Sequence, residues 1–239
     1  GVLSGVAGSY FSTPSAAANQ ITGSIDIRVK ATLADWTPSV AMTLVSKAIV
    51  AGNGLSYWFY VGTDGKLNGA ISSTGANSEA KTSSVATEFS NGTVHWVRWT
   101  WGTSDKVWRF YTSEDGETWT QLGTDSAAGA LTAIASTSTQ VEVGSDTAGG
   151  GSNVDGRIYR AQIYNGINGT LAVDFNPNLS TSAQTFTAAT GEVWTTNGTA
   201  RIFGNTDSTY GIPAQWDAYG PFGYLAEGAR TNLALQSQT

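Results

Sequence analysis

Apolar and polar residues alternate along several segments of this chain with a period of two, which predicts strands that bury one face. The clearest case is residues 25–33, in which every odd position is apolar and every even position is polar. Longer strands, rich in β-branched or aromatic residues, are also predicted at residues 55–62, 94–101, 107–113, 139–144 and 157–164. Shorter strands are predicted at residues 9–13, 66–72, 119–123, 171–175, 192–196 and 200–203.

Turn dipeptides separate these segments. Asp64-Gly65, Asn91-Gly92, Asp115-Gly116 and Asn165-Gly166 are typical of tight hairpins, whose central residues need a positive φ. The pattern contains no long amphipathic helix, so the chain is predicted to be all-β, an antiparallel sandwich or jelly roll. We expect one such domain over residues 1–203. Residues 204–239 carry isolated aromatics without strand alternation and are predicted to be a C-terminal arm or linker.

Composition limits the classes of partner and of binding site that the chain can have. The hydrophobic fraction of 40% includes 9 Trp, enough for a large core. A net charge of −6 opposes binding to the phosphate backbone, so no nucleic-acid partner is expected. Without Cys the chain forms neither disulfides nor thiolate zinc sites. No apolar run approaches the roughly 20 residues of a membrane helix, so no membrane insertion is expected.

Several segments together resemble one known group of folds. They are residues 8–14, 21–29, 96–100, 109–123, 156–163 and 192–200. These stretches are similar to the opening strands, central hairpin, late strand and closing hairpin of concanavalin A-like, or laminin-G-like, jelly-roll modules, including those of bacteriophage virion proteins. Residues 223–233 resemble a segment that recurs in phage tail and other virion proteins. The resemblance implies a virion component, whereas the fold alone hosts many functions.

The residue types of this chain give little support for a catalytic site. Some relatives of this fold are glycoside hydrolases, which need two opposed carboxylates. Asp26 has Ser24 and Arg28 as its neighbours on the same strand face, so the paired acids are missing there. His95 is the only imidazole and is predicted to be a hydrogen-bonded core or edge residue. We therefore predict that the protein is not an enzyme.

A metal ion would have to be a hard cation bound by oxygen, as calcium is in many relatives of this fold. Asp146, Asn153 and Asp155 flank the glycine-rich loop at residues 147–153 and are the candidate calcium ligands. No spacing motif selects them, and no other cofactor is predicted.

The remaining candidate chemistry is on strand surfaces. Arg98 should not be buried unpaired, so we expect it to face outward with Trp96, while Trp99 and Trp101 face the core. On residues 107–113 the same argument turns Trp108 and Phe110 inward. The same argument exposes Gln162. Aromatic plates beside guanidinium and amide donors are typical of sugar-binding faces. The candidate carbohydrate-binding residues are Trp58, Tyr60, Trp96, Arg98, Arg109, Tyr111, Arg160 and Tyr164.

The sequence therefore predicts a non-enzymatic bacteriophage structural protein on the virion surface, on the tail or the capsid. Its expected partners are other virion subunits, including copies of itself, and a host-surface glycan. Two alternatives stay open at this point. One is a glycoside hydrolase or lyase of the same fold, and the other is a purely architectural subunit whose exposed aromatics are covered by its neighbours.

Overall fold

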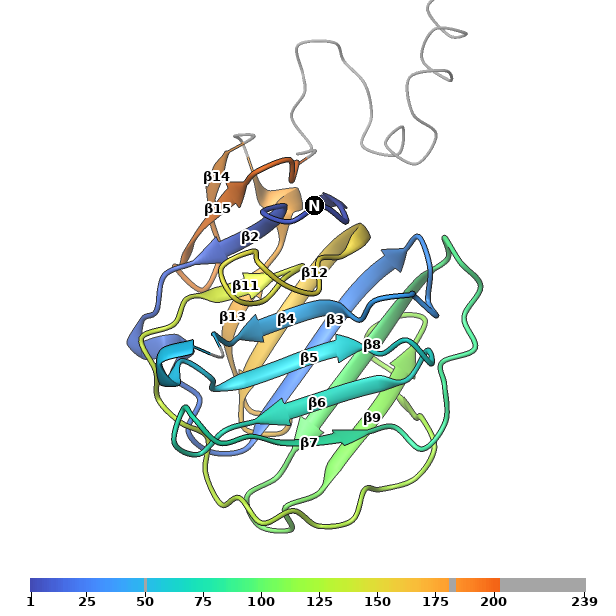
Figure 1. Ribbon diagram of the computed structural model, residues 1–239, viewed down its shortest axis with the longest axis vertical. Coiled ribbons are helices and arrows are strands. Elements are labelled where there is room, and N and C mark those ends of the chain that lie inside the picture. The colour runs from blue at the N-terminus through green and yellow to red at the C-terminus, as the bar shows by residue number, and fades with distance from the viewer. Residues whose placement is uncertain (50, 181–183, 203–239) are drawn as a thin grey trace, which may run out of the picture.

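The computed structural model describes residues 1–49, 51–180 and 184–202, and the statements below concern this part of the chain (Figure 1). The predicted arm at residues 204–239 lies outside it, as does residue 203. Within the described residues, no helix has the length and hydropathy that crossing a membrane requires.

One antiparallel sheet, sheet A, is built from seven strands. In spatial order the strands are β1 (Val2–Ser4), β12 (Asp155–Asn165), β3 (Ile25–Leu33), β8 (Val94–Trp101), β9 (Trp108–Ser113) and β10 (Thr120–Gln121), with β13 (Thr170–Phe175) beside β12. The longest strand, β12, pairs with β3 along one edge and with β1 and β13 along the other.

The second antiparallel sheet, sheet B, has eight strands and lies face to face with sheet A, so the predicted all-β sandwich is confirmed (Figure 1). Its spatial order is β14 (Thr185–Thr187), β15 (Val193–Asn197), β2 (Tyr10–Thr13), β11 (Val141–Val143), β4 (Met42–Lys47), β5 (Tyr57–Val61), β6 (Leu67–Ile71) and β7 (Glu79–Thr82). Three short 3-10 turns complete the described elements: η1 (Ala17–Asn19), η2 (Ala51–Asn53) and η3 (Pro177–Leu179).

The core fills the space between the two sheets. Alternation along β3 turns Ile25, Ile27 and Val29 inward, where they are fully buried. The expected inward set of β8 and β9 is confirmed, because Trp99, Trp101, Trp108 and Phe110 are also buried. The polar residues between them consequently lie on the outer face of sheet A.

Strand β4 is the main element that the sequence pattern did not predict. All six of its residues are buried, so alternation is absent. The strand is central in sheet B, between β11 and β5, and its register shifts between Thr43 and Val45. The short edge strands β1, β7 and β14 were also not predicted. The strand predicted at residues 200–203 is reduced, within the described residues, to a bridge between Arg201 and Val2.

The glycine-rich loop between β11 and β12 is held against the outer face of sheet B. Glu142 of β11 points to that face, yet it is fully buried. Its carboxylate accepts hydrogen bonds from the backbone N–H groups of Ala148 (2.7 Å) and Gly149 (3.1 Å). Residues 147–149 have positive φ, which aims these N–H groups at one carboxylate. The loop is therefore anchored by its neighbouring strand.

Candidate functional site

Two arginines and one carboxylate lie at the centre of the outer face of sheet A. Arg28 of β3 and Arg98 of β8 are direct cross-strand partners. Like charges in such positions repel one another. The carboxylate of Asp26 offsets this repulsion by binding both guanidinium groups. Arg98 donates from Nε (2.9 Å) and Nη2 (2.7 Å), and Arg28 donates from Nε (3.3 Å) and Nη2 (2.9 Å).

Asn168, in the hairpin between β12 and β13, completes this arrangement. Its backbone N–H donates to Asp26 Oδ2 (3.1 Å), and its Oδ1 accepts from Nη2 of Arg28 (2.7 Å) and of Arg98 (2.8 Å). Asp26 is fully buried and accepts five hydrogen bonds. Desolvation lowers the pKa of Arg28, but the hydrogen bonds and charge of Asp26 outweigh it and leave that pKa raised. Both guanidinium groups are thus fixed in place and charged.

Three half-buried aromatic rings surround the two guanidinium groups. The ring centroid of Tyr164 lies 4.3 Å from Arg28 Cζ, and that of Tyr111 lies 5.0 Å from Arg98 Cζ. Trp119 contacts both, at 5.7 Å from Arg28 and 5.5 Å from Arg98. At these distances a cation is attracted to the face of an aromatic ring. We call this set the arginine–aromatic cluster: Asp26, Arg28, Arg98, Tyr111, Trp119, Tyr164 and Asn168.

The turn between β9 and β10 places Trp119 over the sheet. Asp115 Oδ1 accepts hydrogen bonds from Ser113 Oγ (2.9 Å) and from the backbone N–H groups of Glu117 (2.8 Å) and Thr118 (2.7 Å). These bonds, the backbone ones first, lower the pKa of Asp115 to about 2. The turn predicted at Asp115-Gly116 is therefore confirmed, and the Asp115 side chain stabilises it.

The cluster gathers three of the eight candidate residues, Arg98, Tyr111 and Tyr164. Three more lie on the same outer face with other partners. Arg109 forms ion pairs of 2.8 Å with both Asp105 and Asp125, and Arg160 pairs with Asp174 at 2.9 Å. Trp96 lies beneath the β9–β10 turn, with its ring centroid 6.3 Å from that of Trp119.

The expectation that the side chains on this face are exposed was partly wrong. Arg98 is only 6% exposed, Gln162 7% and Trp96 8%. Arg98 tolerates burial because Asp26 pairs with it, and that partner belongs to another strand. Trp96 is covered because Gly116 lies over its ring, where an added Cβ would come within 2.6 Å. The outward direction of these side chains was right, but the hairpins that cover them were not foreseen.

Trp58 and Tyr60 are separated from the other candidates because β5 belongs to sheet B. Their ring centroids are 4.6 Å apart on its outer face. Trp58 Nε1 donates to Thr43 Oγ1 (2.7 Å), and Thr43 Oγ1 donates to Asp146 Oδ2 (3.0 Å). The eight candidates therefore form two surfaces on opposite sides of the sandwich.

Sequence reasoning missed Arg28, Trp119 and Asn168 as members of the cluster, as well as the pairing of Asp26. One signal was available: Asp26 and Arg28 are two residues apart on one strand, so their side chains share a face. Asn168 and Trp119 reach the cluster through two different hairpins. No local pattern brings those hairpins together.

The candidate calcium ligands have other contacts. Asp146 accepts from Thr43 and, through Oδ1, from Thr147 Oγ1 (2.8 Å), and Asn153 Nδ2 donates to the carbonyl of Gly149 (3.2 Å). Asp155 is exposed at the start of β12. Within residues 1–49, 51–180 and 184–202, no group of three or more His, Cys, Asp and Glu is arranged to hold a metal ion. Calcium binding through Asp146, Asn153 and Asp155 stays a prediction.

Three side chains of types that catalysis uses, His95, Asp26 and Glu142, are held by contacts within the protein. His95 stacks on Phe89 with ring centroids 3.6 Å apart, and it lies within hydrogen-bond distance of Thr93 Oγ1 (2.8 Å). Asp26 and Glu142 are fully buried, and hydrogen bonds from the surrounding protein occupy their oxygens. A carboxylate in that state is poorly placed to exchange protons with a substrate.

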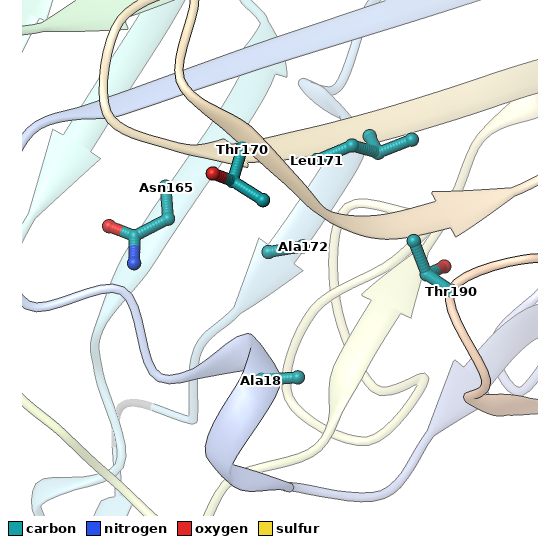
Figure 2. A pocket seen from close by; sticks show the side chains of 6 residues that line it. All are labelled: Ala18, Asn165, Thr170, Leu171, Ala172 and Thr190. Atoms are coloured by element: carbon teal, nitrogen blue, oxygen red, sulfur yellow. The ribbon is translucent and has the colours of Figure 1, made fainter.

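A pocket of about 240 Å³ lies beside the turn end of the β12–β13 hairpin, near η1 (Figure 2). Figure 2 shows that Ala18 comes from η1, whereas Thr170, Leu171 and Ala172 come from β13. Asn165 and Thr190 complete the lining. The described residues of the walls include neither a charged group nor an aromatic ring, so the pocket offers less for ligand recognition than the arginine–aromatic cluster.

Comparison with known proteins identifies the fold. A candidate carbohydrate-binding protein from Bacteroides ovatus is similar in structure, with a TM-score of 0.57, 13% identity, and 80% of this chain aligned to 57% of that one. Domains of the mouse laminin α1 chain give 0.48 and 10% identity, with coverage of 72% and 42%. The enzymatically active domain of tailspike protein 2 from bacteriophage CBA120 gives 0.42 and 10%, with coverage of 61% and 23%.

The chain thus spans just over half the length of the first of these structures. No model of a protein family matches its sequence. No curated protein matches it either. The likeness to the Bacteroides ovatus protein shows the fold, a concanavalin A-like β-sandwich, and at 13% identity it shows nothing finer.

Proposed function

We propose that this chain is a non-enzymatic module of a bacteriophage virion that binds host-surface carbohydrate on the outer face of sheet A. One observation supports this position for the binding site. The arginine–aromatic cluster holds fixed guanidinium donors beside the partly exposed rings of Tyr111, Trp119 and Tyr164. Sugars present an apolar C–H face and a rim of hydroxyls, which match an aromatic ring and nearby donors.

The cluster is prepared for binding before any ligand arrives. Asp26 and Asn168 fix the Nε and Nη2 edges of both arginines, while Nη1 of Arg28 and of Arg98 makes no hydrogen bond with the described residues. Donors that are already immobilised lose little side-chain entropy when they bind. Carbohydrate binding needs this kind of rigid, partly apolar surface. The similar sandwich from Bacteroides ovatus is a candidate carbohydrate-binding protein.

The virion assignment is supported by the sequence. Residues 109–123 resemble the central hairpin of jelly-roll modules in phage virion proteins, and residues 223–233 resemble a segment of phage tail proteins. A location on the virion surface follows from this assignment. So does association with other subunits, including copies of the same chain, because virions repeat their components by symmetry.

A glycan array tests the binding site. The wild-type chain is compared with Tyr164→Ala and Trp119→Ala, and with Trp58→Ala as the matched loss of an aromatic ring from sheet B. We expect selective glycan binding that the first two variants weaken about tenfold, since stacking contributes roughly 1 kcal/mol or more per ring. Loss of binding in Trp58→Ala alone would move the site to sheet B, and absence of any binding would contradict the proposal.

Two further measurements separate the alternatives. Incubating each bound glycan with the protein and searching for shortened products tests the hydrolase or lyase function, and we expect none. Measuring the solvent accessibility of Tyr164 and Trp58 in assembled particles tests the purely architectural role. Full protection of both rings in the particle would favour that role over carbohydrate binding.

A further inference from the structure

We infer that the arginine–aromatic cluster selects acidic sugars, those that carry a carboxylate on the ring. This inference rests on the proposed function and names the ligand class of the same site. It follows from a local excess of positive charge in a chain whose net charge is −6.

Three cations meet one carboxylate at the centre of sheet A. Arg28, Arg98 and Lys30 point to the outer face, and Asp26 is the only acid among them. Lys30 Nζ makes no hydrogen bond or ion pair with the described residues and lies 5.8 Å from the ring of Tyr159. The cluster itself therefore has an excess of one positive charge, and Lys30, two residues from Arg28 on the same strand, raises the local excess to two.

The flanking cations are already neutralised. Arg160 is paired with Asp174, and Arg109 with Asp105 and Asp125. The acids of the β9–β10 turn, Glu114, Asp115 and Glu117, are exposed, and within the described residues none of them forms an ion pair with Arg28, Arg98 or Lys30. The excess charge is thus confined to the place where the aromatic rings are also found.

The remaining guanidinium donors suit a carboxylate by their charge. Nη1 of Arg28 and Nη1 of Arg98 are unbonded to the described residues, and they project from guanidinium groups whose other edges are fixed by Asp26. A carboxylate accepts strong charge-assisted hydrogen bonds from guanidinium groups. The sugar ring that bears it would stack on Tyr164 or Trp119, the rings that flank Arg28.

The test uses an array that carries hexuronic and nonulosonic acid glycans, each beside its methyl ester, together with neutral glycans. We expect the acid forms to bind about tenfold more strongly than their esters, because esterification removes the charge and one acceptor oxygen. Binding should weaken as salt is raised.

Two variants locate the effect. Arg28→Gln and Lys30→Gln should each weaken binding of the acid forms about tenfold. Lys30→Gln should leave the esters little changed, and Arg28→Gln should weaken the esters less than the acids. Lys66→Gln removes the same charge from the β5–β6 turn of sheet B and should change neither. Thermal unfolding shows whether each variant is folded. Among the described residues, the Lys30 side chain interacts only with the ring of Tyr159, so Lys30→Gln remains informative if Arg28→Gln unfolds.

The outcomes distinguish the two proposals. Equal binding of acids and esters, or acid binding that both variants leave intact, overturns the acidic-sugar inference while carbohydrate binding stands. Absence of binding to every glycan overturns the proposed function and the inference with it.

Discussion

The indole of Trp99, on sheet A, occupies the space that a side chain at position 69 of sheet B would need. A Cβ added to Gly69 would lie 2.3 Å from Trp99 Cε2 and 2.4 Å from its Nε1. Phe59, the cross-strand partner of Gly69, has its ring centroid 6.0 Å from that of Trp99. The large side chain of Trp99 therefore fits against sheet B only because position 69 carries no side chain.

Gly69→Ala should therefore destabilise the protein by at least about 2 kcal/mol, because the methyl group would force the sheets apart or Trp99 out of its rotamer. Gly23→Ala is the matched control, since nothing lies within 4 Å of a Cβ at that position. Denaturant unfolding measures both. Equal stability of the two variants would show that Trp99 does not pack on β6.

Trp99→Ala and Trp96→Ala should both be costly, at about 3 to 5 kcal/mol each. The sequence alone predicts tolerance at Trp96, because its side chain points outward. In the fold, however, Trp96 is buried beneath Gly116 and Trp119. Trp58→Ala, at a half-buried position, should cost clearly less. A Trp96→Ala variant as stable as Trp58→Ala would argue that the β9–β10 turn does not cover the sheet.

Asp26→Asn should destabilise the protein by about 3 to 5 kcal/mol, because it leaves two facing guanidinium groups without their buried counter-charge. Asp125→Asn removes a carboxylate from the exposed ion pair with Arg109 and should cost less than about 1 kcal/mol. Chemical unfolding at neutral pH gives both values. If the two substitutions proved equally mild, Asp26 could not be what holds the arginines together.

Lys47 should make the stability depend on pH between about pH 8 and 10.5. Its side chain is fully buried, and Nζ donates to Ser15 Oγ (3.0 Å), Asn19 Oδ1 (3.4 Å) and the carbonyl of Thr139, none of which is a carboxylate. Desolvation lowers its pKa from the ordinary 10.5 to about 8. In this window the unfolded chain keeps a proton that the folded chain has lost, so stability contributed by this site rises with pH.

Comparison with Lys47→Met isolates this effect, since the variant lacks only this one titratable group. The difference in free energy of unfolding, wild type minus variant, should grow with pH by at most about 1.4 kcal/mol per unit within the window. Denaturant unfolding at several pH values from 7 to 10 provides the curves. Parallel curves would mean that Lys47 keeps its proton in the folded state.

Much of the sandwich was determined by the sequence itself. Period-two alternation gave the bounds of β3 and β8 correctly at residues 25–33 and 94–101, and it placed Trp99, Trp101, Trp108 and Phe110 in the core. These features are readable because strand geometry relates neighbours in sequence to opposite faces. Strand β4 could not be predicted from alternation, because both of its faces are covered and all six of its residues are buried.

Which residues form a site was decided only by the tertiary structure. The sequence indicated that Arg98, Tyr111 and Tyr164 point outward, but it could not place β5 in the other sheet, away from them. Nor could it bring Asp26, Trp119 and Asn168 to Arg98 from residues as many as 72 positions away. Side-chain direction is a local property of a strand, whereas strand order and hairpin packing depend on contacts between distant segments, which no local pattern encodes.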